Sequence, residues 1–180
     1  MRIFVALDLP DELTGALSAL QDRLLVGRHV PEDDLHLTLA FLPEIRLPEL
    51  DELALDFEMM STGPLAIGVA GLDIFGGAHP RSVHATVTPS EPLAQLQGKV
   101  STLIRRAGLD LPHRRFVPHV TLARFPNTMP PEDHARLGRF LQAHGDWSHE
   151  PVLPEALTIY QSRLRDDGPV YDPLLSRPLI

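Results

Sequence analysis

The chain has 180 residues, of which 43% are hydrophobic and none is cysteine, and its formal net charge at pH 7 is −8. This length and composition suit one globular domain, and the lack of cysteine excludes disulfide bonds, a thiol nucleophile and cysteine-ligated metal sites. The net negative charge argues against a protein that holds long nucleic acid through many phosphate contacts.

The first half of the chain predicts a strand, a helix, a strand, a helix and two further strands, in that order. Apolar residues recur at helical spacing from Leu13 to Leu24, and the segment that ends at Pro43 alternates as a strand does. The expected elements are a strand over 2–9, a helix over 10–27, a strand over 34–42, a helix over 47–60, and strands over 64–75 and 82–89.

The second half repeats the order of helix, strand, helix, strand and strand. Ser90 is a plausible N-cap for its first helix, and Gly108 is a plausible stop. The expected elements are a helix over 90–108, a strand over 119–125, a helix over 129–145, and strands over 153–164 and 168–180.

This repeated order predicts the fold class. We expect an α+β fold in which residues 1–180 form a single bilobal domain that arose by internal duplication. Each lobe would pack helices on an antiparallel sheet of its own, and a pseudo-two-fold axis would relate the lobes around a central cleft.

Two nearly identical octapeptides mark equivalent places in the two halves: "HLTLAFLP" at 36–43 and "HVTLARFP" at 119–126. Side chains two residues apart in a strand share a face. His36 and Thr38 therefore point the same way, as do His119 and Thr121, while Leu37 and Val120 between them point into the core. A third histidine–threonine pair, in "HATV" at 84–87, lacks the matching flanks, and we interpret it as coincidence.

Two imidazoles and two hydroxyls lining one cleft suit phosphodiester chemistry without a metal. One histidine can remove a proton from water while the other protonates the departing sugar oxygen. The threonine hydroxyls can donate to the non-bridging oxygens of the phosphate. The alternative is a pair of hydrogen-bonded core histidines on duplicated strands.

The two motifs, "HLTL" and "HVTL", resemble the signature of the 2H phosphoesterase superfamily. Within it, the chain is similar to the bacterial RNA 2′,3′-cyclic phosphodiesterases, also called 2′-5′ RNA ligases. The segments that carry this resemblance run through the chain in family order: "RIFVALDLP", "LHLTLAFL", "FVPHVTLARF" and "YQSRLRDDGPVY".

The resemblance implies hydrolysis of an RNA 2′,3′-cyclic phosphate end to a 2′-phosphate, with no metal or other cofactor, and a weak reverse ligation that forms 2′-5′ links. It implies His119 as the proton acceptor from water and His36 as the proton donor to the 3′ oxygen, with Thr38 and Thr121 on the phosphate. The residues alone do not distinguish the two histidine roles.

Three further residues are candidates for substrate binding. Arg124 extends the second motif as it does in many relatives, but strand parity places it on the core side. Either the strand ends or bulges before Arg124, which then reaches the phosphate, or Arg124 forms a structural ion pair. Phe41 holds the equivalent position of the first motif, and it is either a core residue or a surface on which a base stacks. His84 stands where relatives often carry an aromatic residue, and it either stacks on a base or is an exposed strand histidine.

Two other functions are compatible with the same residues. The first is a non-catalytic binder of RNA ends or nucleotides, and the second is a phosphodiesterase for small cyclic nucleotides. A histidine-ligated metallohydrolase is disfavoured because no carboxylate accompanies either motif. No apolar run approaches the roughly 20 residues that cross a bilayer. We expect a cytoplasmic monomer that binds RNA ends or small cyclic nucleotides and no membrane.

Overall fold

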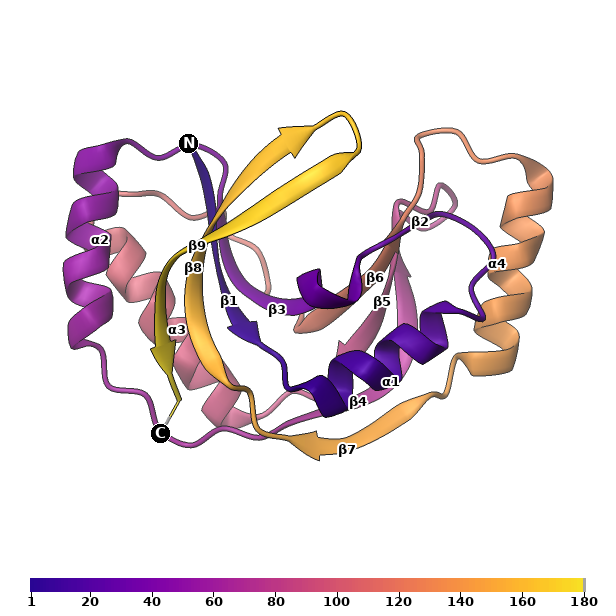
Figure 1. The fold of residues 1–180 in the computed structure, drawn as a ribbon, viewed down its shortest axis with the longest axis horizontal. Coiled ribbons are helices and arrows are strands. Elements are labelled where there is room, and N and C mark those ends of the chain that lie inside the picture. The colour runs from indigo at the N-terminus through magenta and orange to yellow at the C-terminus, as the bar shows by residue number, and fades with distance from the viewer. Residues whose placement is uncertain (180) are drawn as a thin grey trace.

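The computed structural model describes residues 1–179, which form one antiparallel sheet of nine strands with four α-helices (Figure 1). In chain order the elements are β1 (Arg2–Asp8), α1 (Asp11–Gln21), β2 (Arg28–His29), the short 3₁₀ helix η1 (Glu32–Asp34), β3 (His36–Leu42), α2 (Leu47–Met59), β4 (Ile67–Phe75), β5 (Ser82–Val87), α3 (Glu91–Arg106), β6 (His119–Arg124), α4 (Pro131–His144), β7 (Ser148–Val152), β8 (Ala156–Arg165) and β9 (Gly168–Pro178).

The sheet is continuous, where two separate sheets were expected. Its strand order is β7-β4-β5-β6-β3-β1-β8-β9, with β2 paired to β6 outside this path. The two four-stranded halves meet only at the seam between β3 and β6, where Leu37 pairs with Val120. The C-terminal strands β8 and β9 lie beside β1, so the halves of the sheet are not the halves of the sequence. The pseudo-two-fold duplication stays a prediction.

The helices cover the two halves of the sheet separately. Figure 1 shows α2 and α3 together at one end of the molecule, where they contact each other, and α4 at the opposite end. The leucines that predicted α1 are buried, since Leu13 and Leu17 are fully buried and Leu20 is 4% exposed. Within residues 1–179 no helix is long and apolar enough to cross a membrane.

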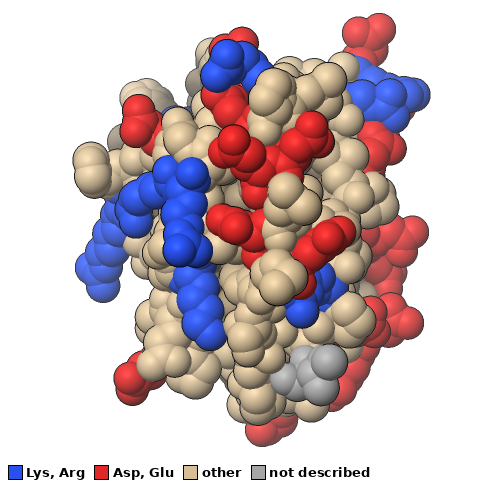
Figure 2. Space-filling model, turned by 90° about the vertical axis from the view of Figure 1, so that its left-hand side faces the viewer, with Lys and Arg blue, Asp and Glu red and all other residues tan. Residues whose placement is uncertain are grey.

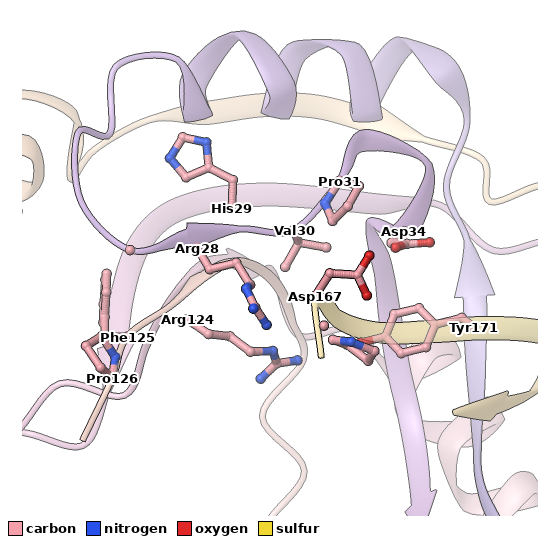
Figure 3. Close-up of a pocket in the computed structure, with 13 residues that line it drawn as sticks. Arg28, His29, Val30, Pro31, Asp34, Arg124, Phe125, Pro126, Asp167 and Tyr171 are labelled. Carbon is pink, nitrogen blue, oxygen red and sulfur yellow. The ribbon is translucent and has the colours of Figure 1, made fainter. Parts of the chain in front are cut away.

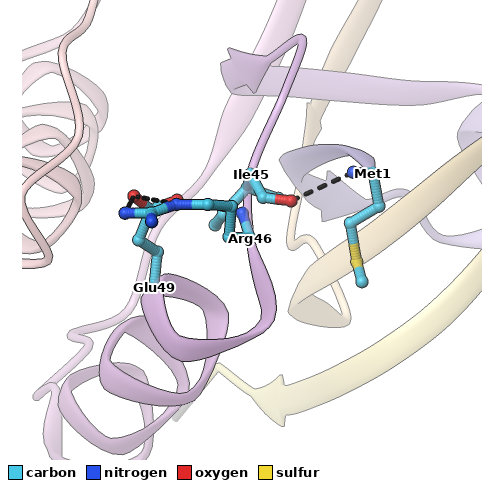
Figure 4. Close-up of polar contacts among 4 residues, drawn as sticks. All are labelled: Met1, Ile45, Arg46 and Glu49. Carbon is cyan, nitrogen blue, oxygen red and sulfur yellow. Dashed lines mark hydrogen bonds and ion pairs between the residues drawn. The ribbon is translucent and has the colours of Figure 1, made fainter.

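Local interactions fix where the helices begin. The Ser90 hydroxyl accepts a hydrogen bond from the Leu93 N–H at 3.3 Å, which confirms the predicted N-cap of α3. At the start of α2, the Glu49 carboxylate accepts from the Arg46 N–H at 2.9 Å and from its guanidinium at 2.6 Å (Figure 4). In the same view the N-terminal ammonium of Met1 donates to the Ile45 carbonyl at 3.0 Å, which joins the start of the chain to this turn.

Some predicted boundaries are wrong. α1 ends at Gln21 rather than near residue 27, and the next residues form a turn that leads to the two-residue strand β2. β7 was not predicted because its sequence, "SHEPV", has a charge and a proline where a central strand would be apolar; it forms an edge strand. Residue 180, the end of the last predicted strand, lies outside the described residues.

A β-bulge interrupts each of the two motif strands at the same place. Thr38 pairs with Ala6 but Ala40 pairs with Val5, so Leu39 is the extra residue of β3. In β6 the register against β5 shifts in the same way, from Thr121 opposite His84 to Ala123 opposite Val83, and Leu122 is the extra residue. Each bulge reverses the inward–outward alternation of the rest of its strand.

The bulges overturn part of the parity prediction. Regular alternation predicts Ala40 on the face of His36 and Thr38, but Ala40 faces the core beside Val5 and is 8% exposed. Phe41 lies opposite Phe4 on the histidine face and is 40% exposed, so its interpretation as a core residue is wrong. Arg124 likewise turns to the face of His119 and is exposed, which is the bulged alternative named for it above.

Candidate active site

The four residues of the two motifs meet at the seam of the sheet. Leu37 and Val120 are paired in antiparallel register there, and both are fully buried on the core face. One residue further along this register, His36 stands across from Thr121 and Thr38 stands across from His119. All four side chains leave the opposite face and are half-buried. Each imidazole therefore faces the hydroxyl of the other strand.

Backbone carbonyls hold the two imidazoles in the same way. His36 Nδ1 donates to the carbonyl of Asp34 at 2.6 Å, and His119 Nδ1 donates to the carbonyl of Val117 at 2.6 Å. A carbonyl oxygen can only accept, so Nδ1 carries the hydrogen in both rings. Each Nε2 is thereby left as the atom that can give or take a proton.

Burial lowers the pKa of both histidines from its ordinary value. The cation of Arg124 also lowers both, while the carbonyl acceptors at Asp34 and Val117 raise them. His36 feels two further charges, because Asp8 raises its pKa and His119 lowers it. Without an anion between them, both rings are therefore biased toward the neutral form.

The neighbours of the two histidines differ in one respect. His36 is paired in register with Asp8 of β1, whereas His119 is paired with Thr86 of β5. The Asp8 carboxylate is held in place, since it accepts hydrogen bonds from the hydroxyls of Thr158 at 2.6 Å and Tyr160 at 2.5 Å. Only His36 therefore has a fixed carboxylate as its register partner.

Aromatic rings confine the His36 imidazole on two sides. Phe4 stacks on it with ring centroids 4.8 Å apart, and Tyr171 meets it edge-on at 5.5 Å. Phe4 also stacks on Tyr160 at 5.1 Å, so β1, β8 and β9 together shape this wall.

His119 is confined by Phe75 and His84, each with its ring centroid 4.9 Å away. His84 is 2% exposed and stacks on Phe75 at 4.3 Å, so its interpretation as an exposed strand histidine is wrong. Burial and the neighbouring His119 lower the pKa of His84 to about 4. So little exposed ring leaves almost no face on which a nucleobase could stack.

Two neighbouring hollows lie next to the site and differ in charge, and His36 lines the acidic one. The arginine hollow, of about 500 Å³, is lined by Gly27, Arg28, His29, Val30, Pro31, Asp34, Arg124, Phe125, Pro126, Asp167, Gly168, Pro169 and Tyr171 (Figure 3). The acidic hollow, of about 370 Å³, is lined by Phe4, Asp8, Leu9, Asp11, Thr14, Glu32, Asp33, Asp34, Leu35, His36, Glu155, Tyr160, Tyr171 and Pro173. Asp34 and Tyr171 line both.

The remaining predicted residues lie at or beyond the rim of this site. The guanidinium of Arg2 lies 5.3 Å from the ring centroid of Phe41 and covers part of it. Arg124 lines the arginine hollow. On the α2 side of the molecule, a band of basic side chains runs down one side, further basic side chains lie at the top and at the other side, and acidic side chains spread over the middle and that other side (Figure 2).

Sequence reasoning missed Asp8, Arg28, Tyr160 and Tyr171. A signal existed for three of them, because Asp8 lies in "RIFVALDLP" and both tyrosines lie in "YQSRLRDDGPVY". Arg28 had none, since it follows a helix that was expected to reach residue 27. Among residues 1–179 no group of three or more histidine, aspartate or glutamate side chains is placed to hold a metal ion.

Comparisons with known proteins agree on one family. The family model of the 2′-5′ RNA ligase superfamily matches residues 9–163. An RNA 2′,3′-cyclic phosphodiesterase of Thermus thermophilus is 30% identical, over 95% of this chain and 86% of that protein. One of Methanocaldococcus jannaschii is 23% identical, over 96% and 97%. The crystal structure of E. coli LigT complexed with 3′-AMP superposes with a TM-score of 0.77 at 26% identity, covering 99% of this chain and 97% of the other.

Proposed function

The chain belongs to the 2′-5′ RNA ligase superfamily, and on that premise we propose that it hydrolyses RNA 2′,3′-cyclic phosphate ends to 2′-phosphates. The observation that carries the proposal is the seam, where two imidazoles with free Nε2 atoms each face a threonine hydroxyl of the other strand. Relatives named for this activity, and one crystallised with 3′-AMP, support a nucleotide end as substrate.

In the proposed reaction, Nε2 of His119 takes a proton from a water molecule as its oxygen attacks phosphorus. The bond from phosphorus to the 3′ oxygen breaks, and protonated His36 gives its proton to that oxygen. One water is consumed and the 2′-phosphate remains. The hydroxyls of Thr38 and Thr121 donate to the non-bridging oxygens, and Arg124 balances their charge as it grows.

The register partners support His36 as the acid and His119 as the base. A carboxylate favours the protonated form of a neighbouring imidazole, and Asp8 is the register partner of His36. Thr86, the register partner of His119, brings no charge. An anionic phosphate between the rings would further favour one protonated histidine.

These groups supply both proton transfers and the neutralisation of charge, so the proposed mechanism uses no metal and no other cofactor. The same site would form a 2′-5′ link if the 5′-hydroxyl of another RNA, in place of water, attacked phosphorus of the cyclic phosphate while the bond to the 3′ oxygen broke and that oxygen took the proton of His36. Water greatly exceeds RNA ends in concentration, so ligation is the minor reaction.

We also propose that the single domain arose by duplication. The bulges at Leu39 and Leu122 occupy equivalent places in the two motif strands. The carbonyl acceptors at Asp34 and Val117 each precede their histidine by two residues. These two matches between the halves support a common origin.

The test is incubation of an RNA oligonucleotide that ends in a 2′,3′-cyclic phosphate with the protein in EDTA. Wild type and His134→Ala, which changes an exposed histidine of α4, should yield the 2′-phosphate at equal rates. His36→Ala and His119→Ala should each lose about 10²–10⁴-fold in rate while remaining folded. Full turnover in either folded variant would exclude the two-histidine mechanism.

The rival functions give different outcomes in the same assay. A non-catalytic binder would retain the oligonucleotide without converting it. An enzyme for small cyclic nucleotides would convert cyclic mononucleotides and leave the oligonucleotide intact. A metal-dependent hydrolase would be active only when EDTA is omitted.

A further inference from the structure

The arginine hollow contains two cations from neighbouring strands. Arg28 of β2 is paired in register with Arg124 of β6, so both side chains leave the same face of the sheet. Figure 3 shows both guanidinium groups pointing into the hollow. Among residues 1–179, neither guanidinium takes part in any of the ion pairs that the structure contains. Both cations are thus available to a bound anion.

The tip of the β8–β9 hairpin lies against the Arg28 side chain. A β-carbon on Gly168 would lie 3.0 Å from Nη1 of Arg28, so the guanidinium rests against the glycine backbone. Gly168 also has φ = +124°, a conformation that residues with side chains rarely adopt. The hairpin tip and the Arg28 guanidinium therefore lie next to each other in the lining of the hollow.

The two hollows leave one favourable path for an RNA chain. Several carboxylates line the acidic hollow, namely those of Asp8, Asp11, Glu32, Asp33 and Glu155. A chain with a negative charge at every linkage is repelled there, and it is attracted toward the pair of arginines. The apolar and aromatic side chains of Val30, Phe125 and Tyr171, together with the Asp167 carboxylate, add surfaces suited to a base and to ribose hydroxyls.

We propose that the arginine hollow binds the penultimate nucleotide, the one that precedes the nucleotide carrying the cyclic phosphate. Arg28 contacts the phosphate that links these two nucleotides. This inference rests on the proposed function and narrows its substrate class to oligonucleotide ends of at least two residues. Arg124 serves the reacting phosphate, and Arg28 serves the next one along the chain.

The test compares three substrates: a cyclic mononucleotide, a dinucleotide with the same cyclic end, and that dinucleotide with an uncharged methylphosphonate linkage. A charge-assisted contact is worth about 1.5–3 kcal/mol, or roughly 10–100-fold. We expect wild type to prefer the charged dinucleotide over both other substrates by about 10-fold or more in kcat/KM. Arg28→Gln should reduce the preference over the uncharged dinucleotide to near one, and Arg28→Lys should retain part of it.

Arg23→Gln is the matched control, because Arg23 is exposed in the same segment and lines neither hollow. It should keep the wild-type preference. Equal turnover of all three substrates by wild type, or an unchanged preference in folded Arg28→Gln, would overturn the assignment of the hollow. If no substrate is turned over, it is the proposed function that fails, and the assignment fails with it.

Discussion

The imidazoles of His84 and His119 lie beside each other, with ring centroids 4.9 Å apart and planes tilted by 58°. His84 is almost wholly buried, and its Nδ1 has no hydrogen-bond partner among residues 1–179. Because its pKa is lowered to about 4, the ring is uncharged near neutral pH. His84 is therefore an uncharged neighbour of His119 and does not oppose protonation of the His119 imidazole by charge repulsion.

The first prediction concerns stability in acid. In the unfolded chain His84 takes up a proton near pH 6.5, but in the folded protein only near pH 4. Stability is therefore lost as the pH falls from 6.5 to 4, by about 3 kcal/mol from this residue alone. His84→Phe keeps the stacking on Phe75 and removes this loss. Urea unfolding at pH 7 and pH 4.5 should show a smaller difference for the variant than for wild type, and equal differences would contradict the burial of an uncharged His84.

The second prediction concerns the proposed acid. Asp8 raises the pKa of His36, so Asp8→Asn should lower it and leave His119 unaffected. The profile of kcat/KM against pH should be bell-shaped in wild type, and its alkaline limb should move to lower pH in the variant. Movement of the acid limb alone would reverse the two histidine roles. Thr86→Ala, beside His119, is the matched control and should move neither limb.

The third prediction concerns Arg124. Its cation lowers the pKa of both His36 and His119, so Arg124→Gln should raise both values. NMR titration of the two imidazoles checks this directly. We expect kcat/KM to fall about 10²-fold or more, because one donor to the developing charge is lost. A loss of activity with unchanged histidine pKa values would place Arg124 farther from the rings than the structure does.

The fourth prediction compares two glycines. Gly168→Ala places a β-carbon against Arg28 in a backbone conformation that favours glycine, so it should destabilise the fold by about 1 kcal/mol or more. It should also weaken the preference for a charged dinucleotide. Gly98→Ala lies in α3, where a β-carbon meets nothing within 4 Å, and should stabilise by about 0.5–1 kcal/mol. Thermal unfolding of both variants provides the measurement.

Periodicity and capping predicted the strands and helices that form the core. The leucines of α1 and the N-cap Ser90 behave as expected because both rules depend on neighbouring residues alone. The pairing of β8 with β1 depends on contacts across the whole chain, and no local pattern encodes it. For the same reason one continuous sheet was not foreseen.

The sequence predicted the face from which each site residue projects only as far as the two β-bulges. Parity holds from His36 to Thr38 and from His119 to Thr121, which is why the four motif residues were placed on one face. It fails beyond them, because the extra residue in each strand has no signature in the sequence. Arg28 was missed for another reason: its importance comes from the approach of a distant hairpin.

The extra residue in β6 decides which way the Arg124 guanidinium points. If all residues of this strand alternated regularly, Arg124 would share the face of Leu122 and enter the apolar layer beside Val83. Deletion of Leu122 would keep Arg124 on the face of His119, because the bulge already sets that residue aside from the pairing. A homologue one residue shorter at this point could therefore keep a cation at the phosphate, whereas one of equal length without the bulge would carry the complete motif and lack it.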